Sequence, residues 1–170
     1  MGLLAGIGVL AFVIILGLII FLVAAMWKVY VKAGEEGWKC IIPIYNAVVL
    51  LKIVGKPWWW IFLMIVPFVI GAIINMSAAL NGTVNPVTTL IAFAVNIVGY
   101  VYVVWTYNML SKSFGKSEGF TAGMLFLGFI FIPILGFGDA RYLGPYGDKA
   151  AFEAYGQKGR FDFEDDKFSN

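Results

Sequence analysis

The densest group of potentially reactive side chains lies between residues 111 and 117. Serines and lysines are interspersed there: Ser111, Lys112, Ser113, Lys116 and Ser117. A serine can act as a nucleophile when a neighbouring lysine with a lowered pKa removes its proton. These residues crowd one short loop between two apolar segments, however, and a solvated turn at a helix end explains them more simply. We therefore predict no catalytic residue here and no enzymatic activity.

Metal, cofactor and disulfide chemistry lack their usual residues. The chain has no histidine and a single cysteine, Cys40, so an internal disulfide is excluded, and zinc or histidine-ligated haem would lack its ordinary ligands. The formal charge of +2 is small, and the basic residues form short clusters without interleaved aromatics. We predict no metal, no cofactor and no nucleic-acid partner.

The composition indicates a membrane protein. Hydrophobic residues make up 61% of the chain and charged residues 13%, and the mean hydropathy is +0.89. A 170-residue soluble core could not bury so much apolar surface. Four apolar segments approach the roughly 20 residues that a spanning helix needs. They are Leu3 to Trp27, Pro57 to Met76, Val87 to Leu110 and Phe120 to Phe137. We predict an all-α membrane protein with about four transmembrane helices.

Two regions depart from simple spanning helices. The fourth segment is short and contains Gly128, Pro133 and Gly136, so it either spans or forms a re-entrant hairpin, which would reverse the side of the tail. Between the first two segments, residues 38–42 and 44–54 are too apolar for solvent but too short and charged to span. Two interfacial helices, broken at Pro43, fit this pattern.

Tryptophan and lysine side chains mark the membrane surface around the second segment. Pro57 begins this segment, and three successive tryptophans follow at the depth where indoles prefer to lie. We predict anchoring to the lipid interface by Trp38, Lys52, Lys56, Trp58, Trp59 and Trp60. The alternative for this region is a dedicated ligand groove built on Tyr45, Asn46 and Lys52.

Polar residues inside the apolar segments are amides and hydroxyls, not charges. Asn75, Asn96 and Asn108 are expected to pack helices together or to contact a ligand. No acidic or basic side chain lies inside the four segments, so an ion pathway lacks its usual residues. A pump or secondary transporter is therefore disfavoured.

Lysines in the loops predict the orientation. Both lysine-bearing loops, residues 28–56 and 111–118, are assigned to the cytoplasm by the excess of positive charge on that side. The N-terminus, the uncharged turn at residues 77–86 and the tail would then lie outside the cytoplasm. We divide the chain into a membrane domain, residues 1–140, and a polar tail, residues 141–170.

The tail is rich in aromatic and acidic residues and too small for a core of its own. It is either a flexible end or a clip that orders on a partner subunit. The aromatic residues expected to bind such a partner are Tyr142, Tyr146, Phe161 and Phe163.

Several motifs between about Lys28 and Tyr142 occur in a fixed order. They are Gly37-Trp38-Lys39, Ile42-Pro43-Ile44-Tyr45-Asn46, the run from Leu51 to Trp60, Phe114-Gly115-Lys116 and the run from Ile134 to Ala140. Together they resemble a bacterial family of small integral membrane proteins of unknown function, in which a similar segment is sometimes fused to, or named as, signal peptidase I. One departure is Val66-Pro67-Phe68-Val69-Ile70, where the family often has Ile-Pro-x-Val-Asn.

The resemblance implies a membrane fold but carries over no mechanism. Signal peptidase I holds its serine and lysine in a β-rich domain, and no such domain follows the serines and lysines here. The leading hypothesis is a non-catalytic subunit or accessory factor of a larger complex in the bacterial inner membrane, with membrane lipids and other integral membrane subunits as partners. The alternative is a protein that binds lipid or a small molecule at the tryptophan- and lysine-rich interface. A transporter or a peptidase-related enzyme comes third.

Overall fold

The computed structural model describes residues 2–156, with side chains from Gly6 onward, and all regular structure in that range is helical. Three helices are long and apolar enough to cross a membrane. They are α1 (Gly2–Lys32), α3 (Trp60–Leu80) and α4 (Pro86–Ser113). The first three predicted spans are thereby confirmed as helices, and the chain is a multi-pass membrane protein by their length and composition.

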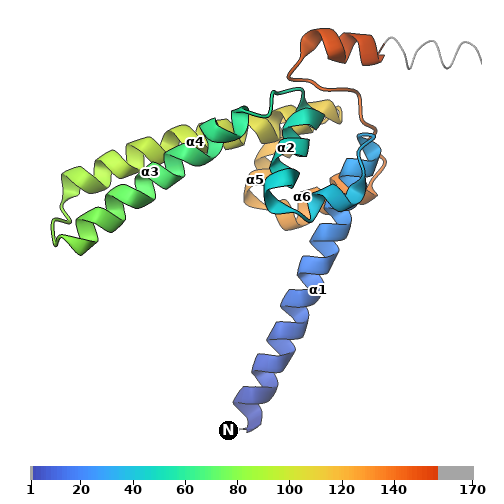
Figure 1. Cartoon of the computed structure of the whole chain (residues 1–170). Helices are drawn as coiled ribbons and strands as arrows, with labels where there is room; N and C mark the ends of the chain where they lie inside the picture. Colours follow the sequence, from blue (N-terminus) through green and yellow to red (C-terminus); the bar gives the residue numbers. More distant parts are fainter. Residues whose placement is uncertain (1, 157–170) are drawn as a thin grey trace, which may run out of the picture.

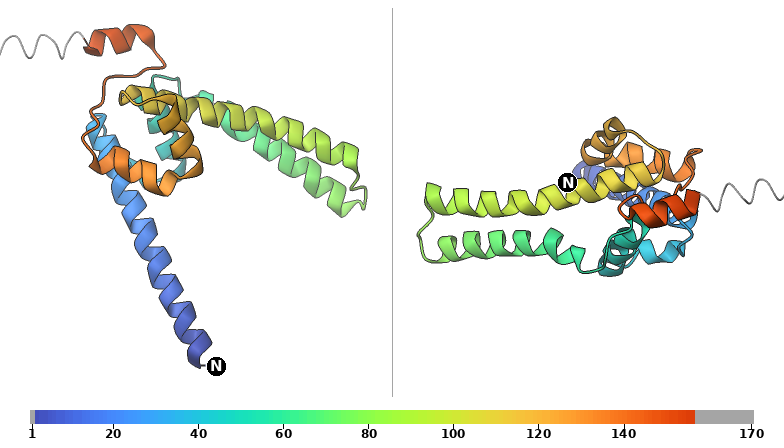
Figure 2. Two further views of the ribbon diagram at one scale, coloured as in Figure 1. Left: turned by 180° about the vertical axis from the view of Figure 1, so that it is seen from behind. Right: turned by 90° about the horizontal axis from the view of Figure 1, so that it is seen from above.

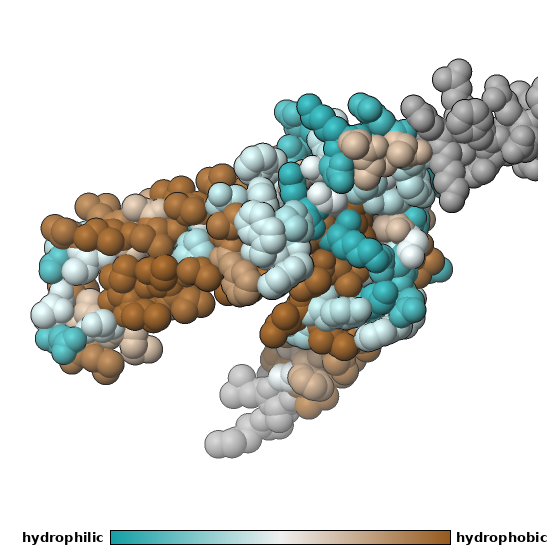
Figure 3. All heavy atoms as spheres, turned by 45° about the horizontal axis from the view of Figure 1, so that its top comes forward, coloured by the Kyte–Doolittle hydropathy of each residue, from teal (hydrophilic) through white to brown (hydrophobic). Residues whose placement is uncertain are grey.

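The long helices extend from one packed body, which we call the head and define as residues 25–57 and 106–156. α3 and α4 form an antiparallel hairpin that leaves the head in one direction, while α1 leaves it in another (Figures 1 and 2). The N-terminal end of α1 and the turn at residues 81–85 are thus both far from the head. In Figure 3, hydrophobic surface covers the hairpin and hydrophilic side chains gather on the head. The apolar helices, which satisfy their own backbone hydrogen bonds, suit the interior of a bilayer, and the polar head suits its surface.

Two short helices link α1 to α3. The one-turn helix η1 (Gly37–Cys40) precedes α2 (Pro43–Val54), so the predicted break at Pro43 is confirmed. Proline suits the first turn of α2 because that position needs no N–H donor, and Gly55 ends the helix in the left-handed conformation with φ of 78°. α2 buries one face, including Val49, Ile53 and Val54, inside the head. The buried side of α2 therefore packs on protein, and its position at a lipid interface stays a prediction.

α3 begins three residues later than the sequence predicted. Pro57 lies in a turn before the helix, and its carbonyl accepts a hydrogen bond from the Trp60 N–H at 3.0 Å. Inside α3, Pro67 is buried and the helix continues through it. The first turn of α4 has a capping box, in which the side chains of Asn85 and Thr88 satisfy each other's backbone N–H groups. The turn between the two helices is therefore closed by uncharged groups.

The fourth predicted span is not one helix. The chain breaks at Leu127 into α5 (Glu118–Phe126) and α6 (Gly128–Phe137), of 9 and 10 residues, each too short to cross a bilayer. The two helices fold back on each other because Gly123 leaves room for the Phe131 ring, which also packs edge-on against Phe120 at 5.1 Å between centroids. The described residues thus contain three candidate spans instead of four. A re-entrant position of the α5–α6 hairpin stays a prediction.

The core of the head joins elements that are distant in sequence. Its buried residues come from the end of α1, from α2, from the end of α4 and from α6, and include Val29, Tyr30, Val54, Leu110 and Leu135. α6 approaches α1 closely because Gly136 has no side chain where the Ala25 carbonyl lies. Contacts between the ends of the helices therefore hold the head together. Outside the head, α1 on one side and the α3–α4 hairpin on the other extend away from this core.

The start of the predicted tail packs on the head and is not a free end. Residues 138–156, which we call the strap, cross α2 and the end of α4 and finish in a helical segment at 149–156. The Leu143 N–H donates to the Ser113 carbonyl at 2.7 Å, and the Gly147 N–H donates to the Val54 carbonyl at 2.7 Å. The Lys56 ammonium also donates to the Gly147 carbonyl, so the strap packs against the end of the first lysine-bearing loop. The side of the membrane on which the tail lies stays a prediction.

Candidate functional site

The structure brings Lys52, Lys56 and Trp58 together around one hollow, which we call the Trp58 pocket. Its volume is about 520 Å³, and its lining residues are Val48, Lys52, Gly55, Lys56, Pro57, Trp58 and Asp148. Gly55 is required where the strap crosses, because a Cβ there would lie 2.8 Å from the Asp148 nitrogen and 2.9 Å from the Pro145 Cβ. The end of α2, the turn before α3 and the strap therefore build the pocket jointly.

The two lysines of the Trp58 pocket also serve the fold. The Lys52 ammonium forms an ion pair with Glu35 at 2.6 Å, although its side chain is 72% exposed. The Lys56 ammonium donates to the Gly147 carbonyl at 3.1 Å and lies 5.2 Å from the centroid of the Trp60 ring. Each ammonium has three N–H donors, so both retain donors for a ligand.

The three consecutive tryptophans have different environments. Trp58 and Trp59 are 62% and 48% exposed. Trp60 points inward and packs edge-on against Tyr102 and Trp105 of α4, with centroids 5.2 and 5.7 Å apart. Its indole nitrogen is buried and has no hydrogen-bond partner among the described residues. Trp60 therefore holds α3 against α4, whereas Trp58 and Trp59 are exposed and their anchoring in a lipid interface stays a prediction.

The residues of the predicted ligand groove point in different directions. The buried Tyr30 hydroxyl donates to the Asn46 side chain and to its carbonyl, the latter at 2.8 Å. The Tyr45 ring instead stacks on the exposed Trp38 ring, with centroids 5.9 Å apart. Lys52 lines the Trp58 pocket without either of them. Asn46 therefore joins α2 to α1, and a ligand groove built on Tyr45, Asn46 and Lys52 stays a prediction.

The three asparagines of the long helices separate into two places. Asn75 donates to the Gly71 carbonyl one turn earlier at 3.0 Å, and the Asn96 amide packs on Gly71, where a Cβ would lie 2.5 Å from Asn96 Oδ1. Asn108 is instead near the head and accepts a hydrogen bond from the Thr121 hydroxyl at 3.2 Å. Asn96 therefore lies at the α3–α4 contact, the exposed Asn75 bonds within α3, and Asn108 joins α4 to α5.

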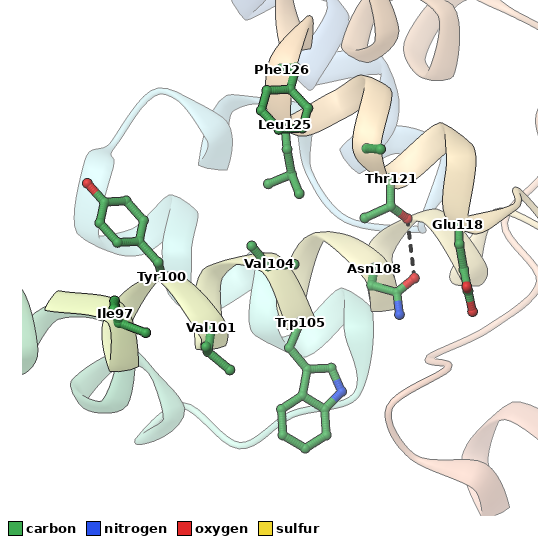
Figure 4. A pocket seen from close by; sticks show the side chains of 11 residues that line it. Ile97, Tyr100, Val101, Val104, Trp105, Asn108, Glu118, Thr121, Leu125 and Phe126 are labelled. Carbon is green, nitrogen blue, oxygen red and sulfur yellow. Dashed lines mark hydrogen bonds between the residues drawn. The ribbon is translucent and has the colours of Figure 1, made fainter. Parts of the chain in front are cut away.

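A second hollow, which we call the α4–α5 groove, was not predicted. It has a volume of about 570 Å³, and Figure 4 shows its apolar side chains with Asn108, Thr121 and Glu118 at one end. The remaining lining residues are Ile97, Tyr100, Val101, Val104, Trp105, Ala122, Leu125 and Phe126. The sequence does not reveal this groove because it depends on the break at Leu127, which makes α5 a separate short helix beside α4.

The aromatic residues of the predicted tail contact the protein itself. The Tyr142 hydroxyl donates to the Ile53 carbonyl at 2.6 Å, and its ring packs edge-on against Phe114 and Tyr155. The Tyr146 N–H donates to the Ser113 hydroxyl at 3.1 Å. Phe161 and Phe163 lie outside the described residues. Tyr142 and Tyr146 therefore hold the strap on the head, and a role in binding a partner stays a prediction.

One family model matches the chain twice. It is a family of unknown function, DUF5684, and it matches residues 38–85 and 73–145, which together span more than half of the chain. The chain belongs to this family. The matched range contains α2 to α6, the α4–α5 groove and every lining residue of the Trp58 pocket except Asp148, and it leaves out α1. No curated protein and no solved structure matches the chain.

The serines and lysines of residues 111–117 occupy a structural turn in this DUF5684 chain. The buried Ser111 hydroxyl donates to the Ser117 carbonyl at 3.1 Å, while the Lys112 ammonium pairs with Glu118 at 3.0 Å. Among the described residues, no hydrogen bond joins a serine hydroxyl of this turn to a lysine ammonium. Within the same range there is also no group of three or more His, Cys, Asp or Glu side chains that could hold a metal ion.

Proposed function

We propose that the protein is a non-catalytic accessory subunit of a larger membrane complex and that α1 provides its main contact with a partner. The observation that carries this proposal is the isolation of α1. Between Ile7 and Ile20 its large side chains are 45–66% exposed, and only its last turns pack in the head (Figure 1). Such a helix can bind another spanning helix without any rearrangement of the head.

One face of α1 suits close packing between helices. Gly6, Gly17 and Ala24 lie about three and two turns apart, on one side of the helix, with Val13 between the two glycines. No atom lies within 4 Å of where a Cβ on either glycine would be. Small residues allow two helix backbones to approach in a membrane, where packing and not hydrophobicity drives association. We call this side of α1 the small-residue face.

Site-specific photocrosslinking tests the accessory-subunit proposal. A photoreactive amino acid at Val13 lies on the small-residue face, and one at Ile15 lies at nearly the same depth on the opposite face. Both positions are exposed, by 57% and 56%. We expect Val13 to give one protein adduct of constant mass in native membranes, and Gly17→Leu to abolish it. Lipid adducts alone at Val13, or equal protein adducts at both positions, would refute the proposal.

We also propose that the lysine-bearing head faces the cytoplasm of a bacterial inner membrane. The support is the location of Lys28, Lys32, Lys52 and Lys56 at the head, whereas the turn at residues 81–85 has no charge. With three spans, the N-terminus and this turn lie outside, and the strap lies inside with the lysines. An apolar α5–α6 hairpin, with Phe126 85% exposed at its tip, would enter the inner leaflet as a re-entrant loop.

A second candidate function is the binding of an anionic lipid in the Trp58 pocket. It is favoured by the meeting of two lysines and an exposed indole at the start of a spanning helix. We expect Trp58→Leu to reduce the anionic phospholipid that remains bound after purification in mild detergent. Trp59→Leu is the matched control, since Trp59 is exposed but does not line the pocket. An equal loss in both variants, or no loss in either, would argue against this site.

A further inference from the structure

A polar hollow lies where the end of α1 meets the beginning of the strap, and we call it the Arg141 pocket. Its volume is about 590 Å³, and its lining residues are Lys32, Gly138, Asp139, Ala140, Arg141 and Tyr142. None of these residues lines the Trp58 pocket. The Arg141 pocket is therefore a separate feature, and its argument does not depend on the functions proposed above.

The cations of the Arg141 pocket have donors to spare. The Lys32 ammonium donates to the carbonyls of Leu135 at 2.8 Å and Gly138 at 2.5 Å, which satisfies the C-terminal end of α6 and leaves one of its three N–H groups. The exposed Arg141 guanidinium forms no hydrogen bond or ion pair with any described residue. Five N–H groups in a planar fork are therefore available on Arg141 alone.

The charge around the Arg141 pocket is positive. Asp139, Lys116 and Lys28 lie near enough to act electrostatically on Lys32. Arg141 and the three lysines face two carboxylates: Asp139 of the lining, and Glu35, which acts on Tyr142 but is itself paired with Lys39 and Lys52. Asp139 reduces the attraction for an anion without reversing it. The pocket is thus complementary to a small anion, and a planar guanidinium matches two oxygens of a phosphate.

The position of the pocket determines which phosphate it would meet. Lys32 ends the candidate span of α1, so the pocket lies at the level of the lipid headgroups. Exposed apolar residues adjoin the lining residues in sequence: Val31, next to Lys32, is 50% exposed, and Phe137, next to Gly138, is 51% exposed. A polar, cationic hollow that continues into exposed apolar surface matches a molecule with a charged head and hydrocarbon chains.

We propose that the Arg141 pocket binds the headgroup phosphate of an anionic membrane phospholipid. Arg141 donates two parallel hydrogen bonds to the phosphate oxygens, and the remaining N–H of Lys32 donates a third. The acyl chains lie along α1 and α6 beside Val31 and Phe137. The lipid thereby joins the end of the first span to the start of the strap.

Native mass spectrometry of the full-length, delipidated protein tests this site. The probes are phosphatidylglycerol and phosphatidylcholine, titrated separately in the same detergent. We expect Arg141→Gln to weaken phosphatidylglycerol binding about tenfold, because one bidentate ionic contact to the phosphate is lost. Phosphatidylcholine carries the same phosphate together with a choline cation, so it should bind the wild-type protein more weakly than phosphatidylglycerol does. Asp139→Asn should strengthen phosphatidylglycerol binding. Lys149→Gln is the control, since it removes an exposed positive charge outside the pocket.

Three results would overturn the assignment. The first is equal phosphatidylglycerol affinity in the Arg141→Gln and Lys149→Gln proteins. The second is wild-type protein that binds phosphatidylcholine as tightly as phosphatidylglycerol. The third is displacement of phosphatidylglycerol by millimolar inorganic phosphate, which would assign the pocket to a soluble phosphate and not to a lipid. If the Trp58→Leu protein lost phosphatidylglycerol and the Arg141→Gln protein retained it, the lipid would be bound in the Trp58 pocket and not in the Arg141 pocket.

Discussion

At the scale of single residues, Glu35 is the charged side chain most embedded in the head. Its side chain is 10% exposed, and its carboxylate pairs with Lys39 at 2.8 Å and Lys52 at 2.6 Å. Burial by itself would raise the pKa of Glu35, but the hydrogen bonds from Lys39 and Lys52 outweigh it and hold the pKa below the ordinary value of 4.5. The charged form of Glu35 therefore stabilises the joint between η1 and α2.

The depressed pKa of Glu35 predicts how stability changes with pH. A carboxylate whose folded pKa is below its unfolded pKa contributes stability above about pH 4.5, and this contribution is lost as the pH falls through the folded pKa. We expect Glu35→Gln to cost about 1 kcal/mol at neutral pH, since Lys52 is exposed to solvent, and to cost less below pH 4. Thermal unfolding in detergent at both pH values measures this difference.

Glu36 provides the matched control for Glu35. It is the next residue, its side chain is 65% exposed, and it lies 3.9 Å from the Lys39 ammonium. Glu36→Gln should therefore change the unfolding temperature much less than Glu35→Gln at neutral pH. Equal effects of the two substitutions, or a larger effect of Glu35→Gln in acid, would show that the ion pairs of Glu35 do not stabilise the head.

At the scale of helices, the contact between α1 and α6 depends on a missing side chain. A Cβ on Gly136 would overlap the Ala25 carbonyl oxygen, and this backbone atom cannot move aside as a side chain would. Gly128 belongs to the same helix, but a Cβ there would lie 3.6 Å from the Ile132 Cδ1, an ordinary contact. The two glycines of α6 thus differ in what an added methyl group would meet.

We expect Gly136→Ala to destabilise the protein by about 1 to 3 kcal/mol, the usual cost of overpacking, because α6 must move away from α1. Gly128→Ala should leave stability nearly unchanged. The unfolding temperature of each purified variant, together with its abundance in the membrane, measures the difference. If Gly136→Ala were as stable as Gly128→Ala, the observed packing of α6 on α1 would be wrong.

Helix boundaries differ in how far the sequence could predict them. The break between η1 and α2 was predictable because Pro43 fixes the first turn of a helix, and hydropathy alone located α1, α3 and α4. The break at Leu127 was not predictable, because the residues from Phe126 to Phe129 are apolar apart from Gly128 and include no proline or charged residue. What divides α5 from α6 is the packing of Phe131 on Gly123, a contact between residues eight positions apart.

At the scale of the whole molecule, residues that are close in sequence could be predicted to meet, whereas contacts between distant segments could not. Lys52, Lys56 and Trp58 were predicted together and share a pocket. The Arg141 pocket was missed because Lys32 and Arg141 are more than a hundred residues apart and meet only through the fold of α6. The strap was assigned to a separate tail because its polar composition resembles a free end, whereas Tyr142 and Gly147 bond to α2.

The number of spans determines the side of the membrane on which the strap lies. Three spans place the strap and the turn at residues 81–85 on opposite sides of the membrane, whereas four spans place them on the same side. Thr83 and Lys149 are exposed at these two places, and replacement of the buried Cys40 by alanine removes the single native thiol.

The most direct test is labelling of Thr83→Cys and Lys149→Cys, each in the Cys40→Ala background, with a membrane-impermeant maleimide. The cells have an outer envelope that the maleimide crosses and an intact cytoplasmic membrane that it does not cross. We predict that position 83 is labelled in these cells, and that position 149 is labelled only after the cytoplasmic membrane is permeabilised. Labelling of both positions in intact cells would contradict the three-span arrangement and the location of the strap beside the cytoplasmic lysines.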